Sequence, residues 1–326
     1  MKRSNTLLII GLIIILISAP YIAWQIFHST PGKAVIIEIP KGTGMMQIAS
    51  ILKASRVLPN RWPFILYSVI TQGPTMKAGE YELREGFSPA DAASILREGK
   101  MLIRKITFPE GIIFNQIVDR MAELHISGAD KAKELFKNPE ILTKFGIAAD
   151  TLEGYCFPDT YYYIKSTTAS EIITHSIEKT FNLWKESWSK SAGFMSLHTL
   201  LMFASIVEKE TALASERPRI AAVFLNRLAA GIPLQSDPTV IYGLKKFKGL
   251  LTKADLRIPT PYNTYIDKDL PPGPICSPSR GSVEAVLHPI PTDELYFVAK
   301  GDGSHVFSRT YPEHLKMVSR YQKGNH

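Results

Sequence analysis

The strongest pattern in the chain is at its N-terminus, where no charged residue occurs from Thr6 to Trp24. A run of this length can cross the hydrocarbon core of a bilayer as a helix. Lys2 and Arg3 precede the run and the next charge is Lys33, so the positive-inside rule places the N-terminus in the cytoplasm and the remainder outside. A cleaved signal peptide is the alternative, but its apolar segment is usually shorter and ends at a small-residue cleavage site. We therefore expect an uncleaved, single-pass membrane anchor.

After the anchor, short β-branched runs alternate with segments of helical apolar spacing up to about residue 108. This pattern predicts strands over 34–39, 77–83 and 101–108, and helices over 45–54, 61–71 and 88–97. In each of three places a strand end, a glycine-containing turn and a helix follow one another, which indicates a repeated structural unit. Chance explains this repetition equally well, because strand–glycine–helix connections are common. The region is typical of a small α+β module.

The remainder of the chain is predicted to be a larger mixed α+β domain. Helical spacing predicts helices over 114–124, 129–136, 170–191, 197–211 and 215–230. Residues 231–278 are rich in Pro, Gly, Asp and Asn, and a loop of this length in a compact domain is usually a functional surface. The Asp302-Gly303 turn predicts a hairpin of strands 294–299 and 304–308, followed by a helix over 312–321.

Composition narrows the class of protein. The hydrophobic fraction of 45% and the charged fraction of 21% exclude a disordered chain. The net charge of +8 fits an anionic membrane surface or wall polymer better than nucleic acid, because an exported protein rarely meets nucleic acid; solubility alone explains the charge equally well. The two cysteines, Cys156 and Cys276, form neither a disulfide framework nor a zinc pattern, and a single bridge between them stays open. We expect no metal and no cofactor.

Candidate chemistry centres on two carboxylates of the helix over 197–211. At about 100° per residue, Glu208 shares a face with Leu201 and Ala204, whereas Glu210 lies roughly 200° away. The two carboxylates therefore cannot point into one cleft if the helix is regular. Because apolar residues occupy both faces, periodicity does not choose between Glu208 and Glu210.

A carboxylate on an apolar face has a raised pKa, because desolvation disfavours its charged form. A protonated Glu is what a glycosidic oxygen requires from a general acid. The alternative, which periodicity alone favours, is a structural Glu that pairs with an arginine such as Arg227. Ser187 and Lys190 match S-x-x-K, but the companion motifs of serine acyl-enzymes are missing, so we interpret this segment as a solvated helix end.

Six segments together resemble a known family. They are EGYCFPDTY (153–161), ASIVEKET (204–211), LQSDPTVIYG (234–243), YNTY (262–265), LPPGPI (270–275) and YFVA (296–299). Their order and spacing resemble the endolytic murein transglycosylases, the YceG-like or MltG family. The resemblance extends from about Ala34 to Tyr321 and is densest from Glu153 to Phe307.

The resemblance implies a domain organisation and an activity. It implies an α+β chain with a cytoplasmic N-terminus and transmembrane anchor over 1–30, a LysM-like module over 31–108 and a catalytic domain over 109–326. The family is attached to the inner membrane with its catalytic domain in the periplasm or outside the cell. It is a lyase that cleaves MurNAc–GlcNAc bonds within nascent glycan strands, leaves 1,6-anhydro-MurNAc ends and terminates elongation. The implied partners are peptidoglycan glycan strands, the membrane and peptidoglycan synthases, with no nucleic acid.

The resemblance also assigns Glu208, the first Glu of the E-K-E-T motif, as the catalytic acid and base. One carboxylate suffices if the substrate's own C6 hydroxyl is the nucleophile, because Glu208 can donate a proton to the leaving oxygen and then accept one from that hydroxyl. We expect three polar residues of the long loop to line the cleft, namely Gln235, Asp237 and Asn263. Stacking or hydrogen bonding to sugar is expected from Tyr155, Tyr262 and His305. The alternative for each is turn formation or packing.

Two other functions stay open. A wall-binding scaffold would keep the anchor and the sugar-binding module but would have no turnover. A true hydrolase would need a second carboxylate near Glu208, and the candidates are Asp237, Glu153 and Asp159. Cys156 stands where the family pattern has a larger apolar residue, which leaves the chemistry unaffected.

Overall fold

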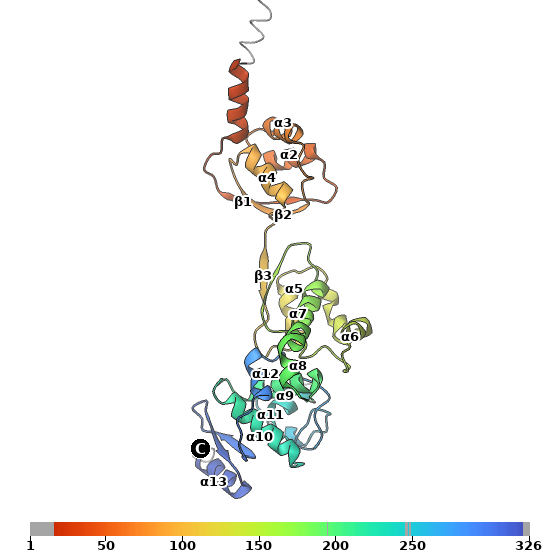
Figure 1. Cartoon of the computed structure of the whole chain (residues 1–326), viewed down its shortest axis with the longest axis vertical. Coiled ribbons are helices and arrows are strands. Elements are labelled where there is room, and N and C mark those ends of the chain that lie inside the picture. Colours follow the sequence, from red (N-terminus) through yellow and green to blue (C-terminus); the bar gives the residue numbers. More distant parts are fainter. Residues whose placement is uncertain (1–15, 194, 245–246, 248, 322–326) are drawn as a thin grey trace, which may run out of the picture. The chain divides into compact units, whose positions relative to one another are not determined.

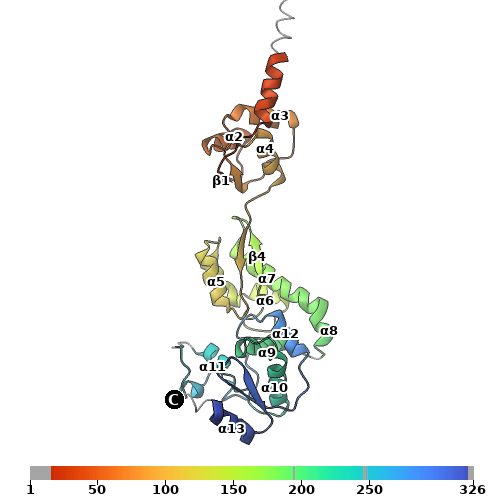
Figure 2. The ribbon, with the colours of Figure 1, turned by 90° about the vertical axis from the view of Figure 1, so that its left-hand side faces the viewer.

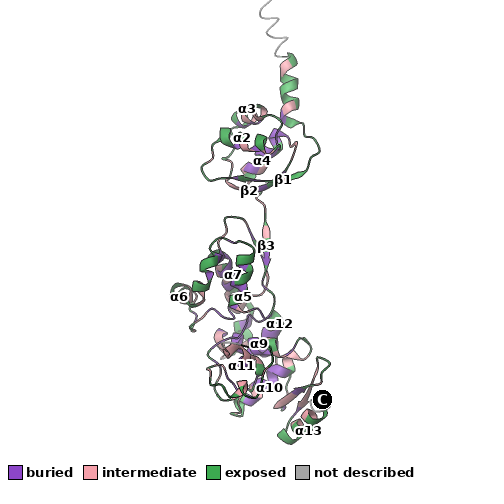
Figure 3. Cartoon of the chain, turned by 180° about the vertical axis from the view of Figure 1, so that it is seen from behind, coloured by how far each residue is buried: buried purple, intermediate pink, exposed green. Residues whose placement is uncertain are grey.

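The computed structural model describes residues 16–321 except 194, 245–246 and 248, and the chain forms two compact units (Figure 1, Figure 2). Among the described residues, the first unit extends to Arg104 and includes residues 162–166. The second unit comprises Lys105–Tyr161 and the residues from Thr167 onward. Each unit has its own buried interior, which Figure 3 marks by colour.

The first unit is a two-stranded sheet with helices that precede and follow its second strand. Its elements are the strands β1 (Ala34–Ile39) and β2 (Gly79–Arg84) and the helices α2 (Met45–Ala54), α3 (Arg61–Thr71) and α4 (Pro89–Glu98). The strands are antiparallel, with Ala34 opposite Arg84 and Ile39 opposite Gly79. The side chain of Ser88 caps α4 by accepting a hydrogen bond from the Asp91 backbone N–H at 3.0 Å.

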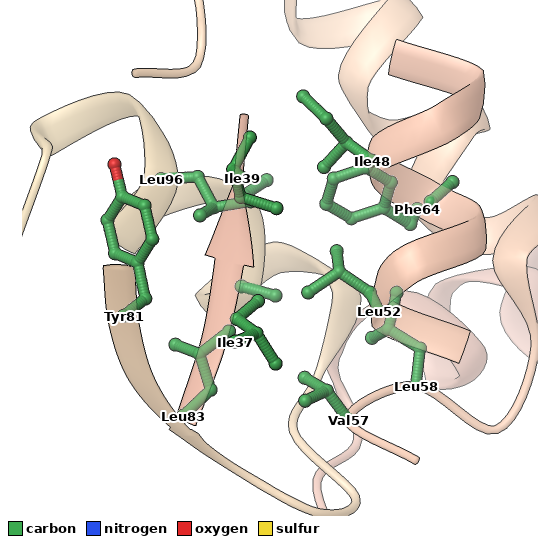
Figure 4. Close-up of a cluster of buried hydrophobic side chains, with 13 residues drawn as sticks. Ile37, Ile39, Ile48, Leu52, Val57, Leu58, Phe64, Tyr81, Leu83 and Leu96 are labelled. Atoms are coloured by element: carbon green, nitrogen blue, oxygen red, sulfur yellow. The ribbon is translucent and has the colours of Figure 1, made fainter. Parts of the chain in front are cut away.

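The core of the first unit forms where one face of the sheet meets the helices (Figure 4). Ile37, Ile39, Tyr81 and Leu83 occupy alternate positions of the two strands and are all buried. They pack with apolar side chains of the helices and the connecting loop, which include Ile48, Leu52, Val57, Leu58, Phe64 and Leu96. The buried side chains of both strands therefore lie on one face of the sheet.

The expected fold class included a membrane-spanning helix, and the structure corrects this expectation. The described part of that segment is a helix over residues 16–27, which is about 18 Å long at the rise of an α-helix. Among the described residues, no helix is both long enough and apolar enough to cross a bilayer, which takes about 20 residues. The part of the predicted anchor before Leu16, and with it the predicted cytoplasmic terminus, lies outside the described residues.

The second unit is mainly helical with two small sheets. Its helices are α5 (Phe114–Glu123), η1 (Ala129–Lys137), α6 (Pro139–Phe145), α7 (Ala169–Leu183), η2 (Trp184–Trp188), α8 (Ser189–Ser191), α9 (Leu197–Glu210), α10 (Arg217–Ala229), α11 (Asp237–Gly243), η3 (Asp255–Arg257), α12 (Arg280–Leu287) and α13 (Tyr311–Tyr321). It contains β5 (Tyr296–Ala299) and β6 (His305–Ser308), most of β3 (Arg104–Thr107) and the first half of β4 (Thr160–Tyr163). β3 pairs with β4, and β5 pairs with β6 as the predicted antiparallel hairpin.

Helix α9 lies at the centre of the second unit, where it packs against α10, α11 and α12. Its residues from Leu200 to Val207 are all buried, so no face of this part of the helix meets solvent. A helix that is apolar on all sides is one that is buried on all sides. This explains why periodicity alone could not select the functional face of α9.

Most predicted elements are confirmed, but four features differ. The segment over 129–136 is a 3₁₀ helix rather than an α-helix, and the long helix over 170–191 is interrupted by a π-helical turn at Trp184–Trp188. The long loop over 231–278 contains α11 and η3, which the sequence pattern did not predict. Helices α6 and α12 and strand β4 were also not predicted.

Candidate active site

Glu208 stands in the last turn of α9, and its side chain is only 6% exposed. Helix α9 begins at Ser196, whose Oγ accepts a hydrogen bond from the Thr199 backbone N–H at 3.1 Å. It ends before Thr211, whose backbone is extended. The apolar residues of α9 fix the helix in the interior, so the direction of the Glu208 side chain is set by the fold rather than by local flexibility.

The carboxylate of Glu208 is surrounded by donors. Oε2 accepts hydrogen bonds from the Ser279 backbone N–H at 2.9 Å, from the Ser279 hydroxyl and from the Ser282 hydroxyl at 2.6 Å. Oε1 accepts one from Nη2 of Arg217 at 3.3 Å. One oxygen is therefore occupied by three donors and the other by a single, longer contact. Sequence analysis expected an apolar environment for Glu208, and the structure has a polar one.

These donors come together because α12 points its first turn at Glu208. Ser279 precedes the helix, and its Oγ also accepts a hydrogen bond from the Ser282 backbone N–H at 3.2 Å. The free N–H groups and the dipole of a helix N-terminus stabilise a carboxylate placed there. A Cβ at Gly281 would lie 2.9 Å from Nη1 of Arg217, so a side chain in this turn would displace the guanidinium that pairs with Glu208.

Arg217, the first residue of α10, is the arginine that pairs with Glu208. Its side chain is 12% exposed, and Nη1 donates to the Ser279 hydroxyl at 3.0 Å. Arg227, the partner that the sequence suggested as the structural alternative, donates instead to Gln235 Oε1 at 2.6 Å and to the carbonyls of Pro233 and Leu295.

A second carboxylate faces the same arginine. Glu110 Oε2 lies 4.0 Å from Nη2 of Arg217, and the Glu110 side chain is 61% exposed. The next residue, Gly111, packs against the site, because a Cβ built there would lie 3.6 Å from Cγ of Glu208 and 3.4 Å from Nζ of Lys209. A hollow of about 530 Å³ adjoins this loop.

The other carboxylates that the sequence raised have separate surroundings. Glu210 accepts a hydrogen bond from the Ser236 hydroxyl at 2.5 Å, and burial raises the pKa of Glu210 to about 7. Glu153 accepts hydrogen bonds from the Phe114 backbone N–H at 3.1 Å and from the Tyr242 hydroxyl at 3.0 Å. Burial likewise raises the pKa of Glu153 to about 7. Asp159 pairs with Lys179.

The predicted substrate-binding residues of the long loop divide into exposed and buried side chains. Gln235 is exposed and held by Arg227, and its backbone has a φ of +53°. Asp237 is exposed and accepts a hydrogen bond from the Tyr265 hydroxyl at 2.6 Å. Asn263 is buried, and its Nδ2 donates to the Leu256 and Ile258 carbonyls at 3.1 and 2.8 Å, so it shapes the loop.

The three predicted aromatic contacts lie in different places. Tyr155 is 1% exposed, and its hydroxyl lies 3.0 Å from Nδ1 of His198. Tyr262 is partly exposed and its ring centroid lies 4.7 Å from that of Tyr242. His305 on β6 lies 2.7 Å, through Nδ1, from Oε2 of Glu216. The contacts of all six predicted binding residues are made away from Glu208, and their role in binding stays a prediction.

Sequence reasoning missed the hydrogen-bonding partners of Glu208, which are Arg217, Ser279 and Ser282, and it missed Glu110, which lies near Arg217. A Ser-x-x-Ser before an apolar run is a helix-start signal and could have indicated α12. Among the described residues no cluster of His, Cys, Asp and Glu could hold a metal ion. Cys156 and Cys276 are both free and buried.

Three comparisons with known proteins agree. The model of the YceG-like family matches residues 37–320. An endolytic murein transglycosylase of Bacillus subtilis (strain 168) is 36% identical, and the match covers 88% of this chain and 84% of that protein. One from Streptococcus pneumoniae (strain ATCC BAA-255 / R6) is 30% identical over 89% of this chain, which spans only 58% of that longer relative.

A solved structure has the same fold. The crystal structure of a YceG-like protein from Listeria monocytogenes aligns with a TM-score of 0.61 and 34% identity, over 87% of this chain and 98% of that one. The family model covers well over half of the chain, and the sequence and structural relatives name the same group. The chain therefore belongs to the YceG-like family.

Proposed function

We propose that this protein is an endolytic peptidoglycan lytic transglycosylase that cuts MurNAc–GlcNAc bonds within nascent glycan strands. The observation that carries the proposal is Glu208, a buried carboxylate held by Ser279, Ser282 and Arg217 in a chain whose relatives are named endolytic murein transglycosylases. A fixed carboxylate is what proton transfer at a glycosidic oxygen requires.

The reaction needs one carboxylate that moves a proton twice. Glu208 donates its proton to the glycosidic oxygen as the bond to C1 of MurNAc breaks. The C6 hydroxyl of the same MurNAc then attacks C1 and returns its proton to Glu208, which leaves a 1,6-anhydro-MurNAc end and a free GlcNAc end. We assign both transfers to Oε1, because three donors already occupy Oε2. The intramolecular attack benefits from a high effective concentration of the nucleophile.

The remaining assignments are supported to different degrees by the contacts of each residue. The exposed side chains of Gln235 and Asp237 are available to sugar hydroxyls, and we propose them as substrate-binding residues, together with Tyr262 and His305. The buried Asn263 and Tyr155 are proposed to act by holding the loop and the core beneath the substrate.

The first unit and the cellular setting complete the proposal. A small two-stranded sheet with packed helices supports a LysM-like, glycan-binding module over residues 31–108. Peptidoglycan lies outside the plasma membrane, so we propose a periplasmic or extracellular site of action for the catalytic domain. Cutting nascent strands would terminate their elongation, which makes peptidoglycan synthases the proposed partners.

The test is mass spectrometry of the fragments that the purified protein and its Glu208→Gln variant release from nascent, uncrosslinked peptidoglycan. Wild type is expected to release anhydro-ended fragments, and the variant at least about 10³-fold fewer, because the proton donor is lost. The two proteins should unfold at similar temperatures, since Gln keeps the size of the side chain.

The outcomes separate the alternatives. Reducing ends from wild type would replace the proposal with a two-carboxylate hydrolase. Strands that are bound but not cut would favour a scaffold. Undiminished cleavage by Glu208→Gln would show that another residue is the acid and base.

A further inference from the structure

Glu110 lies in a loop that is fixed to the segment carrying Ser279. The Gly111 backbone N–H donates to the Ser277 carbonyl at 2.9 Å, and the Ser277 N–H donates to the Ile112 carbonyl at 2.8 Å. Gly111 has a φ of +71°, which an L residue adopts only with strain. These two hydrogen bonds fix the backbone next to Glu110 to Ser277, which lies two residues before Ser279. They involve no atom of the Glu110 side chain.

Glu110 and Glu208 share one nitrogen of Arg217. Nη2 lies 3.3 Å from Glu208 Oε1 and 4.0 Å from Glu110 Oε2. The sum of these two distances places the two carboxylate oxygens at most roughly 7 Å apart, which does not exceed the separation of the carboxyl pairs that flank a scissile glycosidic bond. The pair is unequal in exposure, since the Glu208 side chain is 6% exposed and that of Glu110 is 61% exposed.

Glu110 lines a hollow of about 530 Å³. Sugar hydroxyls and amides need hydrogen-bonding partners, and the lining of this hollow supplies them. Its polar side chains are Glu110, Gln116, Asp119, Arg120 and Glu123. Glu110 is the member of the set that also lies near Arg217, so it connects the hollow to the arginine that pairs with Glu208.

We infer that Glu110 is a second catalytic residue, whose carboxylate contacts the MurNAc ring and stabilises the positive charge that develops at C1 as the glycosidic bond breaks. This inference rests on the proposed function. Glu110 forms no covalent bond and transfers no proton, so the products stay anhydro-ended. A negative charge placed beside a developing positive charge acts mainly in the transition state, and it therefore raises kcat with little effect on KM.

The test compares Glu110→Gln, Glu110→Asp and a matched control, Glu134→Gln, which replaces an exposed carboxylate of η1 outside the hollow. Initial rates of anhydro-end formation are measured against the concentration of nascent glycan strands. Glu110→Gln is expected to lower kcat by on the order of 10–100-fold with KM nearly unchanged. Glu110→Asp should recover part of the rate, and Glu134→Gln should match wild type. All three should unfold at the wild-type temperature.

Each result has a distinct meaning. Wild-type kcat in Glu110→Gln, with wild-type cleavage intact, overturns the role of Glu110 and leaves the proposed function standing. A rise in KM alone makes Glu110 a binding residue and overturns the charge-stabilising role. Reducing ends or no cleavage from wild type overturn the proposed function, and the inference falls with it.

Discussion

Two carboxylates two residues apart on α9 have opposite environments. Glu208 meets the donors of Ser279, Ser282 and Arg217, whereas Glu210 meets only the Ser236 hydroxyl among its described hydrogen-bond partners. The helical repeat separates their directions by about 200°, so one motif supplies the proposed catalytic group and a second carboxylate whose pKa is raised by burial. The difference has a measurable consequence for stability.

Glu210 should make the protein less stable as the pH rises. Burial raises the folded-state pKa of Glu210 from 4.5 to about 7, so between these values the folded state retains a proton that the unfolded state releases. Stability is then highest below the unfolded-state pKa and falls until the pH passes the folded-state pKa. Glu210→Gln, which carries no charge in either state, should remove this contribution, on the order of 2–3 kcal/mol between pH 4.5 and 8.

Urea unfolding at a series of pH values measures this effect. Because burial also raises the pKa of Glu153 to about 7, a decline of similar size should remain in Glu210→Gln and disappear in the double variant with Glu153→Gln. An unchanged pH dependence in Glu210→Gln would mean that Glu210 is ionised in the folded state at neutral pH.

At the scale of elements, the first turn of α12 serves both the helix and the site. Ser279 caps α12 through Ser282 and binds Glu208 through its N–H and its hydroxyl. Thr168 caps α7 in the same way, by accepting from the Glu171 N–H at 3.2 Å, but its contacts are with Glu171 rather than with Glu208. The two caps therefore form a matched pair.

Ser279→Ala and Thr168→Ala should cost similar stability but differ in activity. Each removes one helix cap, which costs about 1 kcal/mol. Only Ser279→Ala also removes a donor to Glu208, and it should lower the cleavage rate on the order of tenfold or more. Thermal unfolding and anhydro-end formation are measured for both variants. Equal activity in the two would show that the Ser279 hydroxyl contributes only to folding.

Elements with a sustained pattern could be predicted from the sequence, and irregular ones could not. The β-branched run in Ala34–Ile39 and the helical spacing in Phe114–Glu123 agree with the observed strand and helix, each of which buries a single face. The spacing of apolar residues in the predicted helix does not reveal the π-helical turn at Trp184–Trp188. Helix α12 was missed because it is short, contains Gly281 and follows a Pro-rich loop.

The candidate site could be predicted only in part, for a similar reason. The motif made Glu208 a candidate, whereas its hydrogen-bonding partners lie on α10 and at the start of α12, and Glu110 lies in the loop before α5. Hydrophobic periodicity reports which face of an element is buried, not which distant element covers it. Which donors would meet Glu208 therefore could not be derived from the pattern around it.

At the scale of the whole molecule, the described residues contain two units with separate cores. Leu52 of α2 is fully buried in the first, and Leu200 of α9 is fully buried in the second. Residues that share no contacts contribute independently to stability. The two leucines allow the independence of the units to be tested.

Leu52→Ala should destabilise the first unit and leave the stability of the second unit unchanged. Leu200→Ala should destabilise the second unit and leave the stability of the first unchanged. Each substitution leaves a cavity that costs about 2–5 kcal/mol. Differential scanning calorimetry should show two transitions, of which each variant lowers one. A single transition that both variants lower equally would show that the units unfold together.

The double use of Ser279 links catalytic competence to local opening of the protein. A local opening requires less free energy than unfolding of the whole protein, and opening of the first turn of α12 would withdraw the N–H and the hydroxyl that hold Glu208. Molecules in that state are folded by every global probe but have a carboxylate out of position. On heating, turnover should thus decline before any loss of helical signal, and a gap in temperature between the two declines would show that this turn opens before the whole protein unfolds.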